Sequence, residues 1–300
     1  MKIEEFVSIN RALGHTIKKV GDYYFRSQHD TGFPFPVYSA FPIEKKVDVN
    51  RRLARVLSWR FLITQVIFKL PKKDIHEFVL TTDNYEIEQF SKNARKSIRK
   101  ALRVFSTRKP SMEGLLNEGF VINKQTCERQ SRTDERMVDY NKWSQYVKAI
   151  YDSSSFTILG AYLENRMVGY LVVYELEGKF QTDGAFIDRN YTGGASPMKT
   201  LLFTCMNNLV IKYGNVTLSY GYHRFFRPTS LTTFKENMLF QKYSYAKGYI
   251  VNPLLLLGLN MTVFIMIKIL KRKSFKQKLG KEIVYLYQGH RRLKEALRLI

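Results

Sequence analysis

One stretch, residues 178–212, restricts the fold more than any other part of the sequence. Apolar residues alternate over Lys179–Asp188 and predict a strand, which leads into Asn190–Gly194, a loop rich in residues that accept unusual backbone angles. Ser196-Pro197 is typical of a helix start and Gly214 of a helix end. Loop N–H groups and the helix dipole both attract negative charge, so this succession predicts an anion site. An ordinary tight turn gives the same local pattern, and the rest of the chain has to decide.

The composition indicates a folded protein with an anionic partner. The chain has 300 residues, 45% of them hydrophobic, which suits one large or two modest domains. Its net charge of +23 favours nucleic acid, anionic lipid or phosphorylated small molecules, although a generally basic surface gives the same figure. Two distant cysteines, Cys127 and Cys205, and an N-terminus without signal-peptide features predict a cytoplasmic location.

The order of predicted elements resembles a known fold. From residue 139 we expect a helix, three strands, the loop with its helix, a strand, a helix and a last strand. This order resembles the GNAT acyltransferases, whose acyl-CoA loop reads Gln or Arg, two residues, Gly, one residue, then Gly or Ala. Gly193 and Ala195 match that loop, and Asn190 replaces the longer first residue. Tyr85–Leu102, YEIEQFSKNARKSIRKAL, resembles the basic helix that closes the first domain of the Fem-like, double-GNAT proteins.

The resemblance implies a mixed α/β (α+β) fold of two tandem GNAT-like domains. Each would hold a mixed, mostly antiparallel sheet flanked by helices. The expected limits are residues 1–110 for a degenerate first domain, 111–250 for a complete acyltransferase domain, and 251–300 for an apolar helix with a basic tail. The sequence departs from the family near its end, where Lys235 stands at the position of a tyrosine that protonates the leaving thiolate, and Leu239 replaces a glycine. These departures affect the chemistry more than the fold.

The activity implied by the resemblance is N-acyl transfer from acyl-CoA, with acetyl-CoA the first expectation, to an amine. A metal is not expected, because no HExxH, paired CxxC, Walker or GxSxG motif is present. The residues expected to bind the donor are Phe186, Ile187, Asn190, Thr192, Gly193, Gly194, Ala195 and Ser196.

Three residues are candidates for the chemistry. Asp183, in the strand before the loop, could deprotonate or orient the amine, and His223 could shuttle protons. Lys235 could neutralise a developing anion. Each also has a structural interpretation, as a surface aspartate, an exposed loop histidine or a lysine of changed role.

A second hypothesis keeps the fold and changes the donor. Fem-like enzymes use aminoacyl-tRNA to modify peptidoglycan peptides or lipids, and the helix predicted over Glu86–Val104 has a basic outer face that suits a phosphate backbone. A solvated basic face is the plain alternative. The expected tRNA contacts are Lys92, Arg95, Lys96, Arg99 and Arg103.

The C-terminal region suggests a membrane contact. Leu254–Ile267 is apolar but shorter than the ~20 residues that span a bilayer, and a run of lysines and arginines follows it. Residues 254–281 could therefore lie against an anionic membrane, at its inner face, or pack as core with a basic tail. A third hypothesis is accordingly a non-catalytic GNAT-like protein that binds membrane.

Overall fold

A computed structural model describes residues 1–28, 36–41, 48–68, 75–130, 135–188, 190–191, 194–224, 229–258 and 278–298. Its contacts form two compact units. Unit 1 comprises Met1–Ile9 and His76–Tyr243, and unit 2 comprises Asn10–Ile75 and Ser244–Ile300. The units follow contacts in space, so their limits differ from the domain limits at residues 110 and 250, which stay predictions.

Unit 1 is built on a sheet with the strand order β5-β10-β9-β8-β7-β6. In that order the strands are β5 (Ile75–Thr82), β10 (Val216–Arg224), β9 (Lys179–Ile187), β8 (Arg166–Leu176), β7 (Phe156–Leu163) and β6 (Ser106–Arg108). Strands β6 to β9 pair antiparallel, whereas β10 runs parallel to β9. The predicted mixed, mostly antiparallel sheet is confirmed.

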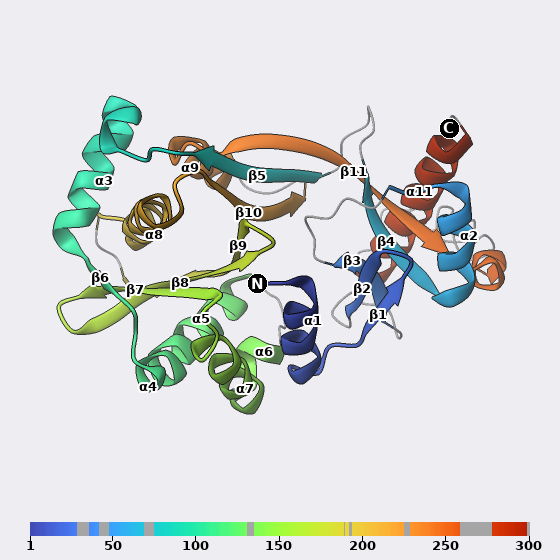
Figure 1. Cartoon of the computed structure of the whole chain (residues 1–300), viewed down its shortest axis with the longest axis horizontal. Coiled ribbons are helices and arrows are strands. Elements are labelled where there is room, and N and C mark those ends of the chain that lie inside the picture. Colours follow the sequence, from blue (N-terminus) through green and yellow to red (C-terminus); the bar gives the residue numbers. More distant parts are fainter. Residues whose placement is uncertain are drawn as a thin grey trace. The chain divides into compact units, whose positions relative to one another are not determined.

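Different helices cover the two faces of this sheet (Figure 1). On one face α3 (Lys92–Val104) and α8 (Pro197–Tyr213) pack with the strands in a single apolar core that includes Ile98 and Leu201. On the other face lie short helical turns over residues 112–119, then α5 (Phe120–Gln130), α6 (Glu135–Val138) and α7 (Tyr140–Tyr151). The buried Trp143 of α7 fixes that layer, because its indole N–H donates to the carbonyl of Leu115 at 3.2 Å. Two further helices of the chain are α1 (Ile3–Ala12) and α9 (Thr229–Asn237).

The strands of unit 2 follow the order β1-β2-β3-β4-β11. The strands are β1 (Ile17–Val20), β2 (Tyr23–Gln28), β3 (Val37–Phe41), β4 (Ile63–Phe68) and β11 (Gln241–Val251). Helix α2 (Arg51–Arg60) begins at Asn50, whose side chain accepts from the N–H of Leu53. The long helix α11 (Lys278–Arg298) packs Leu293 into the same core as Leu57 of α2.

The sequence predicts strands over Phe120–Thr126 and Trp59–Leu70. The first prediction is wrong, because this segment is the start of α5. The second is right in part, because residues 63–68 form β4 while Trp59 and Arg60 end α2. In α5 the buried positions Ile122, Asn123, Thr126 and Cys127 recur at helical spacing, which the β-branched run Val121-Ile122 obscures.

The surroundings of His290, on helix α11, predict that the stability of the protein depends on pH. Burial lowers the pKa of His290, the Lys294 charge lowers it further, and the hydrogen bond to the Tyr249 carbonyl, at 3.0 Å from Nδ1, works against both. The unfolded chain then takes up the proton more readily than the folded one, so stability is full above the ordinary pKa of about 6.5 and falls as the pH drops below it. Thermal unfolding of wild type and His290→Gln across this range checks the prediction. An equal slope in both proteins would contradict it.

Candidate functional site

A β-bulge places Asp183 outside the regular ladder of unit 1. In the β8–β9 register Val172 pairs with Gly184 and Val173 with Thr182, which leaves Asp183 without a partner strand residue. A bulge bends the strand and redirects a side chain, and bulges are frequent beside active sites. The predicted catalytic candidate therefore sits at the irregular point of the strand that precedes the glycine loop.

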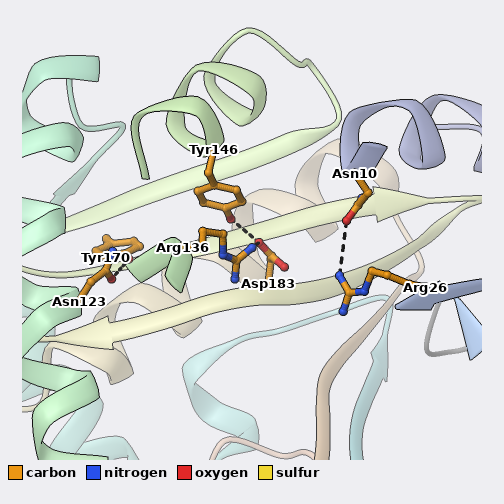
Figure 2. Close-up of polar contacts among 7 residues, drawn as sticks. All are labelled: Asn10, Arg26, Asn123, Arg136, Tyr146, Tyr170 and Asp183. Carbon is orange, nitrogen blue, oxygen red and sulfur yellow. Dashed lines mark hydrogen bonds and ion pairs between the residues drawn. The ribbon is translucent and has the colours of Figure 1, made fainter. Parts of the chain in front are cut away.

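Two side chains from the helical layer hold the Asp183 carboxylate (Figure 2). The hydroxyl of Tyr146, on α7, donates to Oδ2, and Nη1 of Arg136, on α6, lies 3.2 Å from the same oxygen. Burial, and next the Asp183 charge, raise the pKa of Tyr146 well above its ordinary value, so the phenol keeps its proton and donates it in the bond. Asp183 remains 24% exposed and Arg136 26% exposed, so both are still within reach of a ligand.

Unpartnered polar atoms lie buried in the same layer. Phe180 packs into the α3–α8 core, so Gln181, its neighbour on the strand, faces the helical layer that also holds Asp183. Oε1 of Gln181, Nδ2 of Asn123 and Oγ1 of Thr126 are buried without a hydrogen-bond partner, while Oδ1 of Asn123 accepts from the Tyr170 hydroxyl. Buried polar groups normally find partners, so this face favours a ligand or water there.

Strands β9 and β10 are joined only at their beginnings. In the described strands the register links Leu218 with Phe180 and Ser219 with Gln181, and no later pair. Tyr220 on β10 follows directly after these pairs, and Asp183 on β9 lies two residues after Gln181. Backbone groups beyond the last pair are not used by this ladder, which makes them candidates for binding a substrate carbonyl.

Lys235 is fully buried, with 0% of its surface exposed. Its Nζ lies 3.8 Å from the ring centroid of Tyr220 and 4.8 Å from that of Phe78, as in cation–π contacts. Burial raises the pKa of Tyr220 above its ordinary value, so the ring beside Lys235 stays a neutral phenol. Next to it the Ser219 hydroxyl donates to the Glu77 carboxylate at 2.9 Å. A lysine in such surroundings is a strong local source of positive charge.

The loop before α8 is organised by Asp188. Its carboxylate accepts from Arg166 and from the backbone N–H of Asn190, the latter at 2.9 Å, and its own N–H donates to the carbonyl of Val168. Phe186 and Ile187, which we expected to bind the acyl donor, pack inward. The ring of Phe186 packs against the ring of Tyr170. Ala195 is buried and Gly194 exposed, whereas Thr192 and Gly193 lie outside the described residues.

Two lysines converge on the start of α8. A Cβ built on Gly194 would lie 3.0 Å from Nζ of Lys100, so the ammonium of this α3 residue reaches the loop. Nζ of Lys199, on the first turn of α8, donates to the Ser97 hydroxyl, and burial lowers its pKa. Ser196 takes the N-cap position as expected, but its hydroxyl makes no capping bond. The helix N-terminus and two cations thus meet at one place, which suits a phosphate.

Lys100 belongs to a continuous basic face on α3. The exposed cations recur at spacings of three and four residues, which places them on one stripe. They are Lys92, Lys96, Arg99, Lys100 and Arg103, with the half-buried Arg95 at their side. Among them Arg99 has a carboxylate partner, Glu88, at 3.4 Å and with both side chains exposed.

The structure places two predicted catalytic residues, Asp183 and Lys235, on opposite faces of the unit 1 sheet. Asp183 contacts the helices α6 and α7, whereas Lys235 contacts Phe78 and Tyr220, which belong to or pack on the α3–α8 core. His223 is the last residue but one of β10, and its side chain lies outside the described residues. Four residues that the sequence did not indicate take part in these arrangements: Arg136, Tyr146, Asp188 and Lys199.

Leu239, where the sequence resemblance led us to expect a glycine, has a glycine-like backbone. Its φ is +67°, in the left-handed region that favours glycine. The turn after α9 therefore has a backbone shape that glycine adopts most easily, although the residue is a leucine.

The described residues hold no group of three His, Cys, Asp or Glu side chains that could bind a metal ion. None of their helices combines the length and the hydropathy needed to cross a bilayer.

Comparison with known proteins identifies the fold of the chain. No protein-family model matches the sequence, and no curated protein matches it significantly. The crystal structure of FemX superposes with a TM-score of 0.60 over 85% of this chain and 92% of that chain, at 10% identity. The chain has the fold of FemX. The C-terminal domain of a putative lysylphosphatidylglycerol synthetase from Agrobacterium fabrum follows the FemX fold as well, with a TM-score of 0.53, 9% identity, and coverage of 81% of this chain and 86% of that chain.

The FemX comparison confirms the predicted Fem-like resemblance and the mixed α/β fold class. At this level of identity the likeness concerns the fold, and the activity has to be argued from the residues of unit 1.

Proposed function

We propose that the protein is a transferase that moves an acyl group from a phosphate-bearing carrier to an amine. The observation that carries this proposal is the convergence of Lys100 and Lys199 on the uncapped start of α8. Two ammonium groups and a helix dipole at one place bind phosphate oxygens strongly, because hydrogen bonds to charged groups are roughly twice as strong as neutral ones. A FemX fold around this site supports the same class of reaction.

We infer that the carrier is an aminoacyl-tRNA. Helix α3 has 13 residues and is therefore about 20 Å long, and its basic stripe runs from Lys92 to Arg103. A single pyrophosphate needs only the Lys100 end of this stripe, whereas a nucleic-acid backbone presents phosphates along its whole length. Acyl-CoA remains the second candidate, supported by the sequence match of the loop at Gly193 and Ala195.

The chemistry divides between the two faces of the sheet. The amine attacks the carbonyl carbon of the aminoacyl ester, a C–N bond forms, and the C–O bond to the ribose breaks with transfer of a proton to that oxygen. On the helical face, the Asp183 carboxylate orients the incoming amine while Tyr146 and Arg136 fix the carboxylate. From the other face, the buried Lys235 acts on the negative charge of the leaving oxygen through its electric field and not by contact, at the place where β9 and β10 separate.

The acceptor is proposed to be an amine of a cell-envelope peptide or a lipid. The Fem-like resemblance of the sequence supports the peptide, and the name of one structural neighbour, a putative lysylphosphatidylglycerol synthetase, supports a lipid. Such acceptors are held at membranes, so the proposal places the protein in the cytoplasm and at the inner face of the membrane.

Gly194 offers a matched test of the phosphate site. Gly194→Asp sets a carboxylate beside the Lys100 ammonium, so we expect at least a tenfold loss of affinity for the donor, both from the neutralised cation and from like-charge repulsion. Gly194→Ala is the control, because the small clash falls on the flexible end of a lysine and φ is not positive at this glycine. Titration of each protein with charged tRNA and with acetyl-CoA measures both donors. Equal binding by Gly194→Asp and wild type would refute the site.

A second pair of substitutions distinguishes between the two candidate acyl donors, aminoacyl-tRNA and acyl-CoA. Lys96→Glu and Arg103→Glu lie on the stripe away from Gly194, so they should weaken tRNA binding and make its salt dependence shallower, by about one unit in the log–log slope for each lost contact. Binding of acetyl-CoA should not change. If the protein binds acetyl-CoA but has no affinity for tRNA at low salt, the donor is acyl-CoA and not aminoacyl-tRNA.

A further inference from the structure

Helix α2 of unit 2 exposes apolar side chains on its outward face. Its inward residue Leu57 is fully buried, but Trp59 is 62% exposed and Val56 46% exposed, one turn apart. Leu62, just after the helix, is 48% exposed. An exposed tryptophan among aliphatic residues is unusual, because tryptophan is highly buried on average.

A second apolar segment lies directly beside this one. The side-chain amide of Asn252 donates to the carbonyl of Ser58 at 2.9 Å, and its backbone N–H donates to the carbonyl of Leu62 at 2.9 Å. The helical turn over residues 253–258 starts here, and Figure 1 shows it, in orange, next to the end of α2. It exposes Leu254 by 71% and Leu257 by 68%.

These five residues form one surface, the α2 patch: Val56, Trp59, Leu62, Leu254 and Leu257. The charged residues on the two segments that carry the α2 patch are cations. Arg52, Arg55 and Arg60 are exposed on the same helix. The sequence holds no Asp or Glu between Asp48 and Asp74, or between Glu236 and Glu282, so neither segment contributes an acid. An apolar surface on segments that carry cations and no acids is complementary to an anionic surface with an apolar interior.

We propose that the α2 patch docks the protein onto an anionic lipid bilayer. Tryptophan prefers the boundary between headgroups and acyl chains, where its ring is buried and its N–H stays hydrated. The leucines supply apolar area that enters the same boundary, and each arginine near an anionic surface contributes attraction. This inference does not depend on the transfer chemistry of unit 1. It concerns α2 and residues 253–258, whereas the membrane contact expected over 254–281 falls mostly outside the described residues.

Nucleic acid is the less favoured occupant of this surface. Stacking on bases requires aromatic faces, and Trp59 is the single aromatic residue among the five of the α2 patch. Leu254 and Leu257 gain nothing from a hydrated phosphate backbone, but they gain from entering a bilayer.

The tryptophan content of the chain makes the test direct. The sequence has two tryptophans, Trp59 and the buried Trp143, which is 1% exposed. On mixing the full chain with equimolar phosphatidylglycerol–phosphatidylcholine vesicles, Trp59 emission should shift to the blue and be quenched by brominated acyl chains. Trp59→Phe reports Trp143 alone and should show neither effect. Vesicle binding without a change in Trp59 emission would overturn the proposal, and so would a response of Trp59 to tRNA but not to vesicles.

Co-sedimentation with the same vesicles measures the individual contributions. Arg55→Gln should lower the partition coefficient about fivefold, since a basic residue near an anionic surface is worth about 1 kcal/mol. Leu254→Ser with Leu257→Ser should lower it more than tenfold. The matched control is Ile211→Ser on α8 of unit 1, which is 83% exposed and outside the α2 patch, and should bind as wild type does. All these positions are exposed, so folding is not at stake. Equal binding by wild type and the double leucine variant would refute the α2 patch as the docking surface.

Discussion

Lys235→Met is expected to lower the rate of acyl transfer about 100- to 1,000-fold and to leave the protein at least as stable as wild type. The rate falls because a preorganised charge near the leaving group is lost, an effect of the size seen for other electrostatic stabilisers of transition states. The stability holds because a fully buried ammonium is costly to desolvate, and methionine fills a similar volume between Phe78 and Tyr220. Single-turnover transfer and thermal unfolding, measured on the same preparation, check both parts.

Lys235→Arg is the matched control for charge. It keeps the cation but changes its shape and reach, so we expect a partial loss of rate. A purely structural lysine would give the opposite pattern, in which Lys235→Met unfolds many degrees earlier while the rate per folded molecule is unchanged. That outcome would remove Lys235 from the chemistry and leave the rest of the site in place.

The parts of the fold that the sequence predicts well are those with local signals at both ends. The helix after the glycine loop has Ser196-Pro197 at its start and Gly214 at its end, and α8 ends one residue before that glycine. The strands β7, β8 and β9 follow from apolar runs separated by polar turns, and the structure changes their ends by one residue. Helix-capping residues and hydrophobic periodicity were therefore enough to predict the order of elements that this chain shares with FemX.

The failures have an equally local cause. Phe120-Val121-Ile122 has high strand propensity, but packing between the sheet and α7 favours a helix, and tertiary contacts override a weak preference. The segment Trp59–Leu70 is mostly apolar, so the last residues of the helix resemble the strand that follows. The helix is revealed by its start, where Asn50 caps the N–H of Leu53.

The partners of Asp183 were beyond sequence reasoning. Arg136 and Tyr146 precede it by 47 and 37 residues and meet it only through the packing of α6 and α7 on the sheet. The bulge that exposes Asp183 has no motif either, because it depends on the register between β8 and β9. Long-range pairing of this kind is set by the whole core and not by any spacing in the chain.

Asp183→Asn gives the last test, because the structure allows two interpretations of this carboxylate. As the group that orients the amine, Asp183 should be needed for transfer, and its amide variant should lose about 100-fold in kcat/KM, mostly through a higher KM for the acceptor. If Asp183 only forms a structural ion pair, its substitution should lower kcat/KM no more than substitution of its partner Arg136 does. Arg136→Met is therefore the matched control.

Under the orienting role, Arg136→Met leaves the carboxylate charged and still held by Tyr146, so the affinity for the amine should fall much less than in Asp183→Asn. Under the structural role, both variants lower the unfolding temperature by similar amounts, since each breaks the same pair in the same partly buried place. Acceptor titrations with the two variants, read beside their thermal unfolding, separate these cases. Tyr146→Phe sharpens the comparison: it removes one hydrogen-bond donor and no charge, so it should change the affinity for the amine less than Asp183→Asn if charge is what holds the substrate.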